Sequence, residues 1–337
     1  MKKKFENIRV IVPVAGMGTR LRPLTHTVPK VLIPVAGKPI LAHILDEIQK
    51  VGIRKLTIVL GYLGEQIEKY VKTHYDFDVS FCKQEECLGL GHAIYTAKNT
   101  VKDGEELLII LGDTLFDADL TEILSNPMST ICVKEVANPK RFGVVITKGI
   151  EITDMVEKPQ QPISNLAIVG IYYIKEAKEL MNALETIIKE DRKTKGEYQL
   201  TDALKLLLDN GIKMQYSLIK GWYDCGKPET LLKTNSILLQ KKGMKYEYEH
   251  RENGVIIIHP VSIGLDVELS QCVIGPYVTI GDGVIIEKSV VSDCIINSYA
   301  KVKNIVIKKS IIGEKAIVEG NELSLNVGDS SEIKFSI

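Results

Sequence analysis

The chain of 337 residues has neither an excess of charge of one sign nor a long hydrophobic run. It contains 43 Lys and Arg residues and 43 Asp and Glu residues, so its formal net charge at pH 7 is +0. A nucleic-acid-binding surface needs a basic excess, so we expect no nucleic-acid partner. No apolar stretch reaches the roughly 18–20 residues that span a membrane. The apolar run at 8–14 leads directly into a charged loop, so we expect neither a signal peptide nor a membrane partner.

Cysteine is scarce and its spacing carries no metal-binding pattern. The six cysteines lie at positions 82, 87, 132, 225, 272 and 294. No two of them form the C-x-x-C pair that is typical of a zinc site. Several lie in apolar runs, as reduced and buried thiols do. We therefore expect a cytoplasmic protein, because thiols stay reduced in that compartment.

The most informative segment is 13–39, which reads Pro-Val-Ala-Gly-Met-Gly-Thr-Arg-Leu-Arg-Pro-Leu-Thr-His-Thr-Val-Pro-Lys-Val-Leu-Ile-Pro-Val-Ala-Gly-Lys-Pro. It follows the apolar run 8–14, which is typical of a buried parallel strand. Its first glycines allow backbone N–H groups to approach an anion closely. Arg20 and Lys30 add positive charge to the same loop. The segment therefore predicts a phosphate-binding site.

Two common phosphate-binding loops do not match this segment. Gly16-x-Gly18 fits the first two glycines of the dinucleotide fingerprint, but Leu21 stands where the third glycine belongs. No Gly-Lys-Ser/Thr sequence closes the loop, as it would in a Walker A motif. A Gly-x-Gly pair alone is also typical of an ordinary turn between strand and helix. The longer string, which continues to Pro39, favours phosphate binding over a simple turn.

From residue 8 to about 240, apolar strands alternate with amphipathic helices. Further strands are expected near 56–60 and 107–111, and helices near 39–51 and 65–71. This alternation predicts an α/β fold with a Rossmann-like, doubly wound mixed sheet, in which ligands bind at the carboxyl ends of the strands. Gly16 and Asp113 both follow predicted strands, so we expect one crevice to hold both. Residues 1–240 form the first predicted domain.

The remaining residues follow a different period. Residues 241–254 are polar and aperiodic, so we interpret them as a connector. From 255 to 337, aliphatic residues recur every five or six positions, beginning with Ile263, Leu269, Ile274, Ile280 and Ile286. Such a hexapeptide-type repeat is typical of a parallel β-helix, here with roughly four coils. Antiparallel strands would instead need hairpin turns at closer spacing. We expect this domain to assemble subunits into a homo-oligomer or to regulate activity.

Two aspartates fall in short motifs that suit a metal site. Asp113 stands in Leu-Gly-Asp-Thr at the end of a predicted strand, and Asp224 stands in Gly-Trp-Tyr-Asp-Cys-Gly. Mg²⁺ prefers a few carboxylates together with phosphate oxygens and water. Together with the opening loop, the pair predicts a Mg²⁺ site, although a Gly-Asp taken alone is more typical of a turn or a helix N-cap.

Three further side chains could bind a phosphate, a sugar and a nucleotide base. The ammonium group of Lys158 suits a phosphate, and Glu157 can accept hydrogen bonds from sugar hydroxyls. Taken alone, this pair is more typical of an exposed ion pair before a turn proline. The amide of Gln84 both donates and accepts, so it can pair with the imide edge of uracil or thymine; the alternative is a surface glutamine. His92, near a predicted helix start, is interpreted as structural.

Together these motifs resemble the sugar-1-phosphate nucleotidyltransferases over nearly the whole chain. The matching segments, in the family's order, are the opening loop, Gly-Asp113, Arg141-Phe-Gly143-Val, Glu157-Lys158-Pro159, Val169-Gly170-Ile-Tyr, Gly196-Glu-Tyr-Gln-Leu-Thr201-Asp-Ala and Gly221-Trp-Tyr-Asp224-Cys-Gly. The chain is most similar to the long form of glucose-1-phosphate thymidylyltransferase, which carries a C-terminal left-handed β-helix. The resemblance implies that the first domain is catalytic and that the β-helix is left-handed.

The resemblance also implies a role for each matched residue. The residues implied to hold the nucleotide are Ala15, Gly16, Gly18, Thr19, Gln84 and Gly89. Those implied to act in catalysis are Arg20 toward the pyrophosphate, Lys30 toward the attacked phosphate and Lys158 toward the sugar phosphate. Those implied to hold the sugar are Gly143, Glu157 and Gly170, and the Mg²⁺ cofactor is assigned to Asp113 and Asp224. The implied reaction joins a nucleoside triphosphate and a sugar 1-phosphate into a nucleotide-sugar, with release of pyrophosphate.

The base and the activity still have alternatives. The segment Gly89-Leu-Gly-His-Ala resembles uridylyl-transferring relatives as much as thymidylyl-transferring ones. UTP with glucose or N-acetylglucosamine 1-phosphate therefore stands beside dTTP with glucose 1-phosphate, because one methyl group is worth only about 1–3 kcal/mol. A hexapeptide-repeat acyltransferase would need a catalytic histidine, and His259 is the only histidine in the repeats. A non-catalytic relative would be expected to lose cations such as Arg20 and Lys30, which this chain keeps.

Overall fold

The computed structural model describes residues 5–241 and 247–320. The chain divides into two compact units, Met1–Thr234 and Asn235–Ile337, and the boundary falls within helix α7 (Pro228–Lys241). Among the described residues, no helix has the length and apolarity needed to cross a membrane. All six cysteines are free thiols, and four of them are buried.

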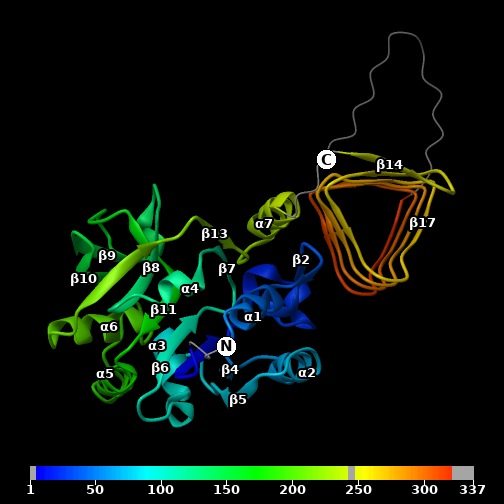
Figure 1. The fold of residues 1–337 in the computed structure, drawn as a ribbon. Coiled ribbons are helices and arrows are strands. Elements are labelled where there is room, and N and C mark those ends of the chain that lie inside the picture. Colours follow the sequence, from blue (N-terminus) through cyan, green and yellow to red (C-terminus); the bar gives the residue numbers. More distant parts are fainter. Residues whose placement is uncertain (1–4, 242–246, 321–337) are drawn as a thin grey trace. The chain divides into compact units, whose positions relative to one another are not determined.

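The first unit is built on a nine-stranded mixed sheet (Figure 1). The strand order is β5-β4-β1-β6-β11-β8-β12-β10-β9. The bounds are β1 Ile8–Pro13, β4 Lys55–Leu60, β5 Asp78–Lys83, β6 Glu106–Ile110, β8 Ser129–Glu135, β9 Gly143–Lys148, β10 Glu151–Glu157, β11 Leu166–Ile174 and β12 Met214–Leu218. Strands β5, β4, β1 and β6 run parallel, and β11 pairs antiparallel with both β6 and β8. The predicted mixed α/β sheet is confirmed.

Helices and short strands join the strands of this sheet. The helices are α1 Ile40–Lys50, α2 Gly64–His74, α3 Leu90–Thr96, α4 Leu120–Ile123, α5 Ala177–Lys189 and α6 Leu200–Asp209. The 3₁₀ turns are η1 Thr19–Leu21, η2 Leu24–His26, η3 Lys30–Leu32, η4 Lys98–Thr100 and η5 Pro139–Arg141. Two short antiparallel pairs are β2 (Pro34–Val35) with β3 (Lys38–Pro39), and β7 (Thr114–Asp117) with β13 (Gly221–Asp224). Helix α1 forms as predicted because its apolar residues recur on one face, which is buried.

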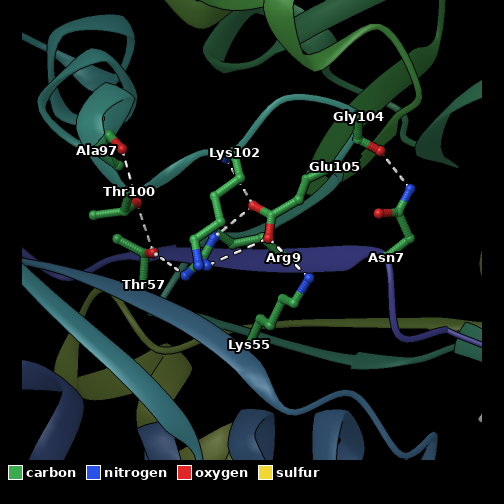
Figure 2. A network of polar contacts seen from close by, with 9 residues as sticks. All are labelled: Asn7, Arg9, Lys55, Thr57, Ala97, Thr100, Lys102, Gly104 and Glu105. Carbon is green, nitrogen blue, oxygen red and sulfur yellow. Dashed lines mark hydrogen bonds and ion pairs between the residues drawn. The ribbon is translucent and has the colours of Figure 1, made fainter.

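One charged cluster lies inside the first unit, at the amino ends of the parallel strands. The side chains of Arg9 and Glu105 are only 4% and 2% exposed, and Arg9 Nε donates to Glu105 Oε2 at 2.8 Å. Lys55 Nζ lies 2.9 Å from Glu105 Oε1, and the backbone amide of Lys102 donates to Oε2 at 3.0 Å. Figure 2 shows these donors converging on the one carboxylate. Arg9 also reaches Thr57 Oγ1 at 3.4 Å, so the buried charges are paired and hydrogen-bonded.

The described part of the second unit is a parallel β-helix with a triangular section (Figure 1). Its three faces are β15-β18-β21-β24, β16-β19-β22-β25 and β17-β20-β23-β26, with every neighbouring pair parallel. The bounds are β15 Val255–Ile258, β16 Val261–Ile263, β17 Glu268–Ser270, β18 Val273–Ile274, β19 Val278–Ile280, β20 Ile285–Glu287, β21 Val290–Ser292, β22 Ile295–Ile296, β23 Lys301–Lys303, β24 Val306–Lys308, β25 Ile311–Ile312 and β26 Ile317–Glu319.

The repeat period explains this fold. Buried Ile274, Ile280 and Ile286 lie on three successive strands and point into one core. Stacking coils in this way buries an apolar face that no single coil could bury. The predicted β-helix is thereby confirmed, whereas its left-handedness stays a prediction. Residues 321–337 of the predicted domain lie outside the described residues.

Part of the predicted connector is a strand. Residues 242–246 lie outside the described residues, but Tyr248–Arg251 form β14, which pairs antiparallel with β15. The polar composition of 241–254 gave no sign of this strand. Pairing with the open edge of the first coil outweighs local propensity, as is common for edge strands.

Candidate active site

A cavity of about 430 Å³ opens where the loops after β1 and β6 meet. The amide of Gly112, which follows β6, donates to the carbonyl of Pro13 at the end of β1 at 3.2 Å. The cavity is lined by these two loops together with residues that follow β5 and by Glu197. The residues of the predicted site that line it are Ala15, Gly16, Lys30, Gln84, Gly89 and Asp113. The structure thus gathers, at one edge of the sheet, side chains that lie far apart in sequence.

The glycine-rich loop turns back on itself. Gly18 has φ +61°, in the left-handed region, and a Cβ there would lie 2.9 Å from Cβ of Lys30. The hydroxyl of Thr25 donates to the carbonyl of Gly18 at 2.9 Å and holds this fold. Gly18 therefore lies against Lys30. Thr19 and Arg20 are exposed in η1 and are not among the residues that line the cavity.

The two predicted metal ligands are brought together by the β7–β13 pair. Asp224 at the end of β13 pairs in register with Thr114, the residue after Asp113. Asp113 Oδ2 lies 2.6 Å from Nζ of Lys30, and its side chain is 44% exposed. Asp224 Oδ1 accepts a hydrogen bond from the amide of Gly226 at 2.8 Å. The pairing of β7 with β13 thus brings Asp113 and Asp224, which lie more than a hundred residues apart in sequence, to the same place.

The buried thiol of Cys225 lies near the charged side chains of Lys30, Asp113 and Asp224. Burial raises the pKa of this thiol to about 12; the Lys30 cation lowers that pKa, whereas the carboxylates of Asp113 and Asp224 raise it. All three charges therefore act on one buried sulfur. A Cβ on the next residue, Gly226, would lie 2.8 Å from Asp224 Oδ1 and 3.2 Å from Nη2 of Arg20. Arg20 therefore lies close to this group, next to Gly226.

The donor set of this group fits Mg²⁺. Asp113 and Asp224 offer hard carboxylate oxygens, and the exposed part of Asp113 is open to a ligand. Within residues 5–241 and 247–320, no three His, Cys, Asp or Glu side chains cluster as a closed metal cage would require. Mg²⁺ is commonly bound by one or two carboxylates while substrate phosphates and water complete its coordination. The pair of aspartates therefore matches a magnesium site that is shared with a phosphate ligand.

A second cluster surrounds Glu157 at the end of β10. Thr201 Oγ1 donates to Glu157 Oε2 at 2.8 Å, and Lys158 Nζ lies 3.2 Å from Glu157 Oε1. A Cβ on Gly143 would lie 2.8 Å from the same Oε2, so a larger residue there would displace this carboxylate. Burial first, and then the charge of Glu157, raise the pKa of Tyr172. Glu157 is thus held in a fixed position while Lys158 is partly exposed.

Strand β11 connects this second cluster with the cavity. Gly170 lies at an irregularity of β11 with φ +90°, and a Cβ there would lie 2.6 Å from Cδ1 of Leu111, which lines the cavity. Two residues away, Ile168 lies against Gly143: a Cβ on Gly143 would be 3.2 Å from Ile168 Cδ1. The predicted sugar-binding residues therefore form one group along β9, β10 and β11.

Gln84 is held at the wall of the cavity. It is 6% exposed, and its backbone amide donates to the carbonyl of Leu60 at the end of β4. Its Nε2 lies 3.3 Å from the carbonyl oxygen of Gly89 and 3.0 Å from Nδ1 of His92. Gly89 has φ +108°, and a Cβ there would lie 2.7 Å from the carbonyl oxygen of Tyr198, so the turn requires glycine.

Several residues in these contacts were not predicted. Thr201 and Cys225 lie inside motifs quoted for the family resemblance, but no local pattern shows that they contact Glu157 or the aspartates. Glu197, which also lies inside a quoted motif, and Cys87, which does not, line the cavity without having been assigned a role. His92, interpreted as structural, contacts the amide of Gln84 directly.

Comparisons with known proteins agree with this geometry. The Nucleotidyl transferase family model matches residues 9–241. The low-salt glycan biosynthesis nucleotidyltransferase Agl11 of Haloferax volcanii is 31% identical, over 95% of this chain and 98% of that protein. The glucose-1-phosphate thymidylyltransferase of Streptomyces antibioticus is 28% identical, over 95% and 93%. The crystal structure of UDP-glucose pyrophosphorylase complexed with UDP-glucose matches with a TM-score of 0.60 and 27% identity, over 70% of this chain and 99% of that chain.

The family match covers well over half of the chain, from the start of β1 to the end of α7, and one full-length relative exceeds 30% identity. The loops that line the cavity and the cluster around Glu157 all fall within the matched residues. The chain therefore belongs to the nucleotidyl transferase family of enzymes, as its motifs predicted.

Proposed function

We propose that this protein catalyses Mg²⁺-dependent transfer of a nucleotidyl group from dTTP or UTP to a sugar 1-phosphate, with glucose 1-phosphate as the favoured acceptor. The products are a nucleotide-sugar and pyrophosphate. The observation that carries the proposal is the cavity in which the glycine-rich loop, Lys30, Asp113 and Gln84 meet. The similarity to a glucose-1-phosphate thymidylyltransferase and to a UDP-glucose pyrophosphorylase bound to UDP-glucose supports the same class of substrates.

The nucleotide phosphates lie along the glycine-rich loop. Gly16 leaves open space, since a Cβ there would meet no atom within 4 Å, and backbone N–H groups can approach an anion. Thr19 donates from its hydroxyl at the outer end of the loop. Lys30 stabilises charge on the phosphate under attack, and Arg20 does so on the departing pyrophosphate. A sugar 1-phosphate oxygen is already anionic, so the attack needs no general base.

Asp113 and Asp224 hold the Mg²⁺ ion, whose chemistry is to offset the phosphate charges. Lys30 now pairs with Asp113, and it becomes available to a phosphate when that carboxylate takes another cation.

The sugar 1-phosphate is held by the cluster around Glu157. The carboxylate accepts hydrogen bonds from sugar hydroxyls, and Thr201 keeps it in place. Lys158 binds the sugar phosphate as a point charge. A Cβ at Gly143 would lie 2.8 Å from Glu157 Oε2 and one at Gly170 would lie 2.6 Å from Leu111 Cδ1, so glycine at both positions keeps these walls of the proposed sugar site in place.

Two other functions have weaker support. In a β-helix acyltransferase His259 would have to act on a substrate, but its Nε2 lies within hydrogen-bond distance of Glu249 Oε2, at 3.1 Å. A non-catalytic relative would not need Lys30 paired with Asp113 and Arg20 close to the same charged group. Six free thiols are in keeping with a cytoplasmic location.

The test is a pyrophosphate-release screen of dTTP, UTP, CTP, ATP and GTP against glucose, galactose and N-acetylglucosamine 1-phosphates. We expect turnover with dTTP or UTP and glucose 1-phosphate, and its loss when Mg²⁺ is chelated. No turnover in any pair would overturn the proposal. Turnover with only ATP or GTP would overturn the base assignment alone.

We also propose that the β-helix assembles the chain into a homo-oligomer. Its described faces carry exposed apolar side chains, among them Val290, Val306 and Ile317. Light scattering of the full chain, coupled to size exclusion, is expected to give a multiple of the chain mass of 37.5 kDa. A single-chain mass across micromolar concentrations would overturn this proposal.

A further inference from the structure

The amide of Gln84 is oriented by two acceptors, and only one of them belongs to the backbone. Its Nε2 lies 3.3 Å from the carbonyl oxygen of Gly89 and 3.0 Å from Nδ1 of His92. A carbonyl oxygen can only accept, so Gly89 fixes Nε2 as the atom that faces it. The second N–H then points to His92, whose Nδ1 accepts while the ring proton sits on Nε2. Both amide hydrogens are thereby used within the protein.

The frame that holds these acceptors is rigid. The amide of Tyr198 donates to the carbonyl of Leu88, and the amide of Gly91 donates to the carbonyl of Tyr198, both at 2.8 Å. A Cβ on Gly91 would lie 2.9 Å from that same carbonyl oxygen, so α3 begins directly against the Tyr198 backbone. His92 is the third residue of α3 and therefore cannot drift away from Gln84 without breaking these contacts.

The remaining amide atom is Oε1 of Gln84. It accepts no hydrogen bond from any residue in the described part of the chain, and it is not sealed in the interior. Gln84 lines the cavity, so Oε1 is the atom that it offers to a ligand. An acceptor here suits a ring N–H, such as N3–H of uracil or thymine. N3 of cytosine is itself an acceptor, so it would leave both groups unpaired.

We propose that His92 is a positioning residue for base selection: by accepting the second Gln84 amide proton, it keeps Oε1 turned to the base, and this favours uracil and thymine over cytosine. The inference rests on the proposed function. It differs from an aromatic packing role, because the ring contact of His92 with Tyr198 is distant and tilted, with centroids 6.4 Å apart. What His92 contributes is an acceptor, and a side chain of similar size without one does not replace it.

The test compares His92→Leu with His92→Asn. The two side chains are similar in size, but only Asn has an acceptor, Oδ1, bonded to Cγ as Nδ1 is in histidine. Pyrophosphate release is measured with UTP, dTTP and CTP, and binding of UMP and CMP is measured by calorimetry. We expect His92→Leu to lower the ratio of kcat/KM for UTP to kcat/KM for CTP about tenfold, because one hydrogen bond is lost. Most of this change is expected to come from a higher KM for UTP. His92→Asn is expected to keep the ratio within about threefold of the unmodified chain. His74→Ala, at an exposed histidine of α2, is the matched control and leaves the ratio unchanged.

The outcomes separate the inference from the proposed function. If the unmodified chain releases pyrophosphate but His92→Leu keeps its selectivity, or if His92→Asn loses it equally, the inference is wrong and the function stands. If the unmodified chain neither turns over nor binds any pyrimidine nucleotide, the proposed function is wrong. A measurement without variants uses N3-methyl-UMP, which lacks the N–H donor. It is expected to bind the unmodified chain at least about tenfold more weakly than UMP, and equal binding would overturn the inference.

Discussion

The substitution Glu105→Gln is expected to destabilise the first unit strongly without touching the candidate active site. Glu105 accepts from Arg9, from the backbone amide of Lys102 and from Lys55, and the Arg9 side chain is 4% exposed. A neutral amide would leave the Arg9 cation buried without its counter-charge, which costs about 3–5 kcal/mol. For a unit of this size, such a loss lowers Tm by roughly 6–20 °C.

The assay is denaturant and thermal unfolding followed by the fluorescence of Trp222. It is the single tryptophan of the chain and lies in β13 of the first unit, with its ring 4.7 Å from that of Phe142. The matched control is Asp76→Asn, which breaks the exposed pair with Arg54, worth no more than about 1 kcal/mol. A double variant, Arg9→Met with Glu105→Leu, removes both charges and is expected to recover most of the lost stability.

Two results would refute this reasoning. If Glu105→Gln lowers stability no more than Asp76→Asn does, the carboxylate is not needed to offset a buried cation. If the double variant is as unstable as the single one, shape rather than charge decides stability at this place. At temperatures where Glu105→Gln is still folded, pyrophosphate release is expected to match that of the unmodified chain, because Glu105 precedes β6 whereas the cavity lies beyond its other end.

The other predictions concern pH, the metal site and the two substrate pockets. Burial raises the pKa of Glu105, but hydrogen bonds from Arg9, Lys102 and Lys55 outweigh this effect and leave the pKa below 4.5. The stabilisation by Glu105 is therefore complete above pH 4.5 and is lost as the pH falls through the pKa of the folded state. Acid unfolding of the unmodified chain is expected to show this loss, and acid unfolding of Glu105→Gln is expected to lack it. Asp113→Asn is expected to abolish Mg²⁺-dependent pyrophosphate release, and near-normal turnover would refute the metal assignment. Thr201→Val removes the hydroxyl that holds Glu157, so KM for the sugar 1-phosphate should rise about tenfold with kcat little changed; an unchanged KM would count against the sugar site. Gly89→Ala is expected to cost about 1–3 kcal/mol in Trp222 unfolding and to raise KM for the nucleotide, since its φ of +108° and the carbonyl of Tyr198 leave no place for Cβ.

The parts of the fold that depend on local periodicity could be predicted from the sequence. The β-helix is the clearest example, since Val261 pairs with Val278 and Ile295 with Ile311, so each coil repeats the one before it. The strand that leads into the glycine-rich loop could also be predicted, because both signals lie within one short segment. The family resemblance then extended these signals to the candidate site residues.

Contacts between distant strands could not be predicted in this way. Asp113 and Asp224 share a site only because β7 pairs with β13, and no local pattern states that pairing. The same holds for Thr201 and Glu157, which belong to α6 and β10. Residues 248–251 are a further example, since their polar composition does not indicate a strand. The strand forms because the edge of β15 is present to pair with it.

The two ends of the parallel strands use charge in opposite ways. At the amino ends, Arg9 and Glu105 are buried and meet their donors and acceptors within the protein, which is how a buried ion pair avoids a net penalty. At the carboxyl ends, Asp113 is 44% exposed and its partner Lys30 is 10% exposed, so breaking this partly exposed pair costs less stability than breaking the fully buried pair of Arg9 and Glu105. Glu105→Gln should therefore lose more stability and keep activity, whereas Asp113→Asn should lose activity and keep most of its stability. A shared loss in both variants would mean that the two clusters are coupled through the sheet, and the assignment of one to folding and the other to chemistry would have to be given up.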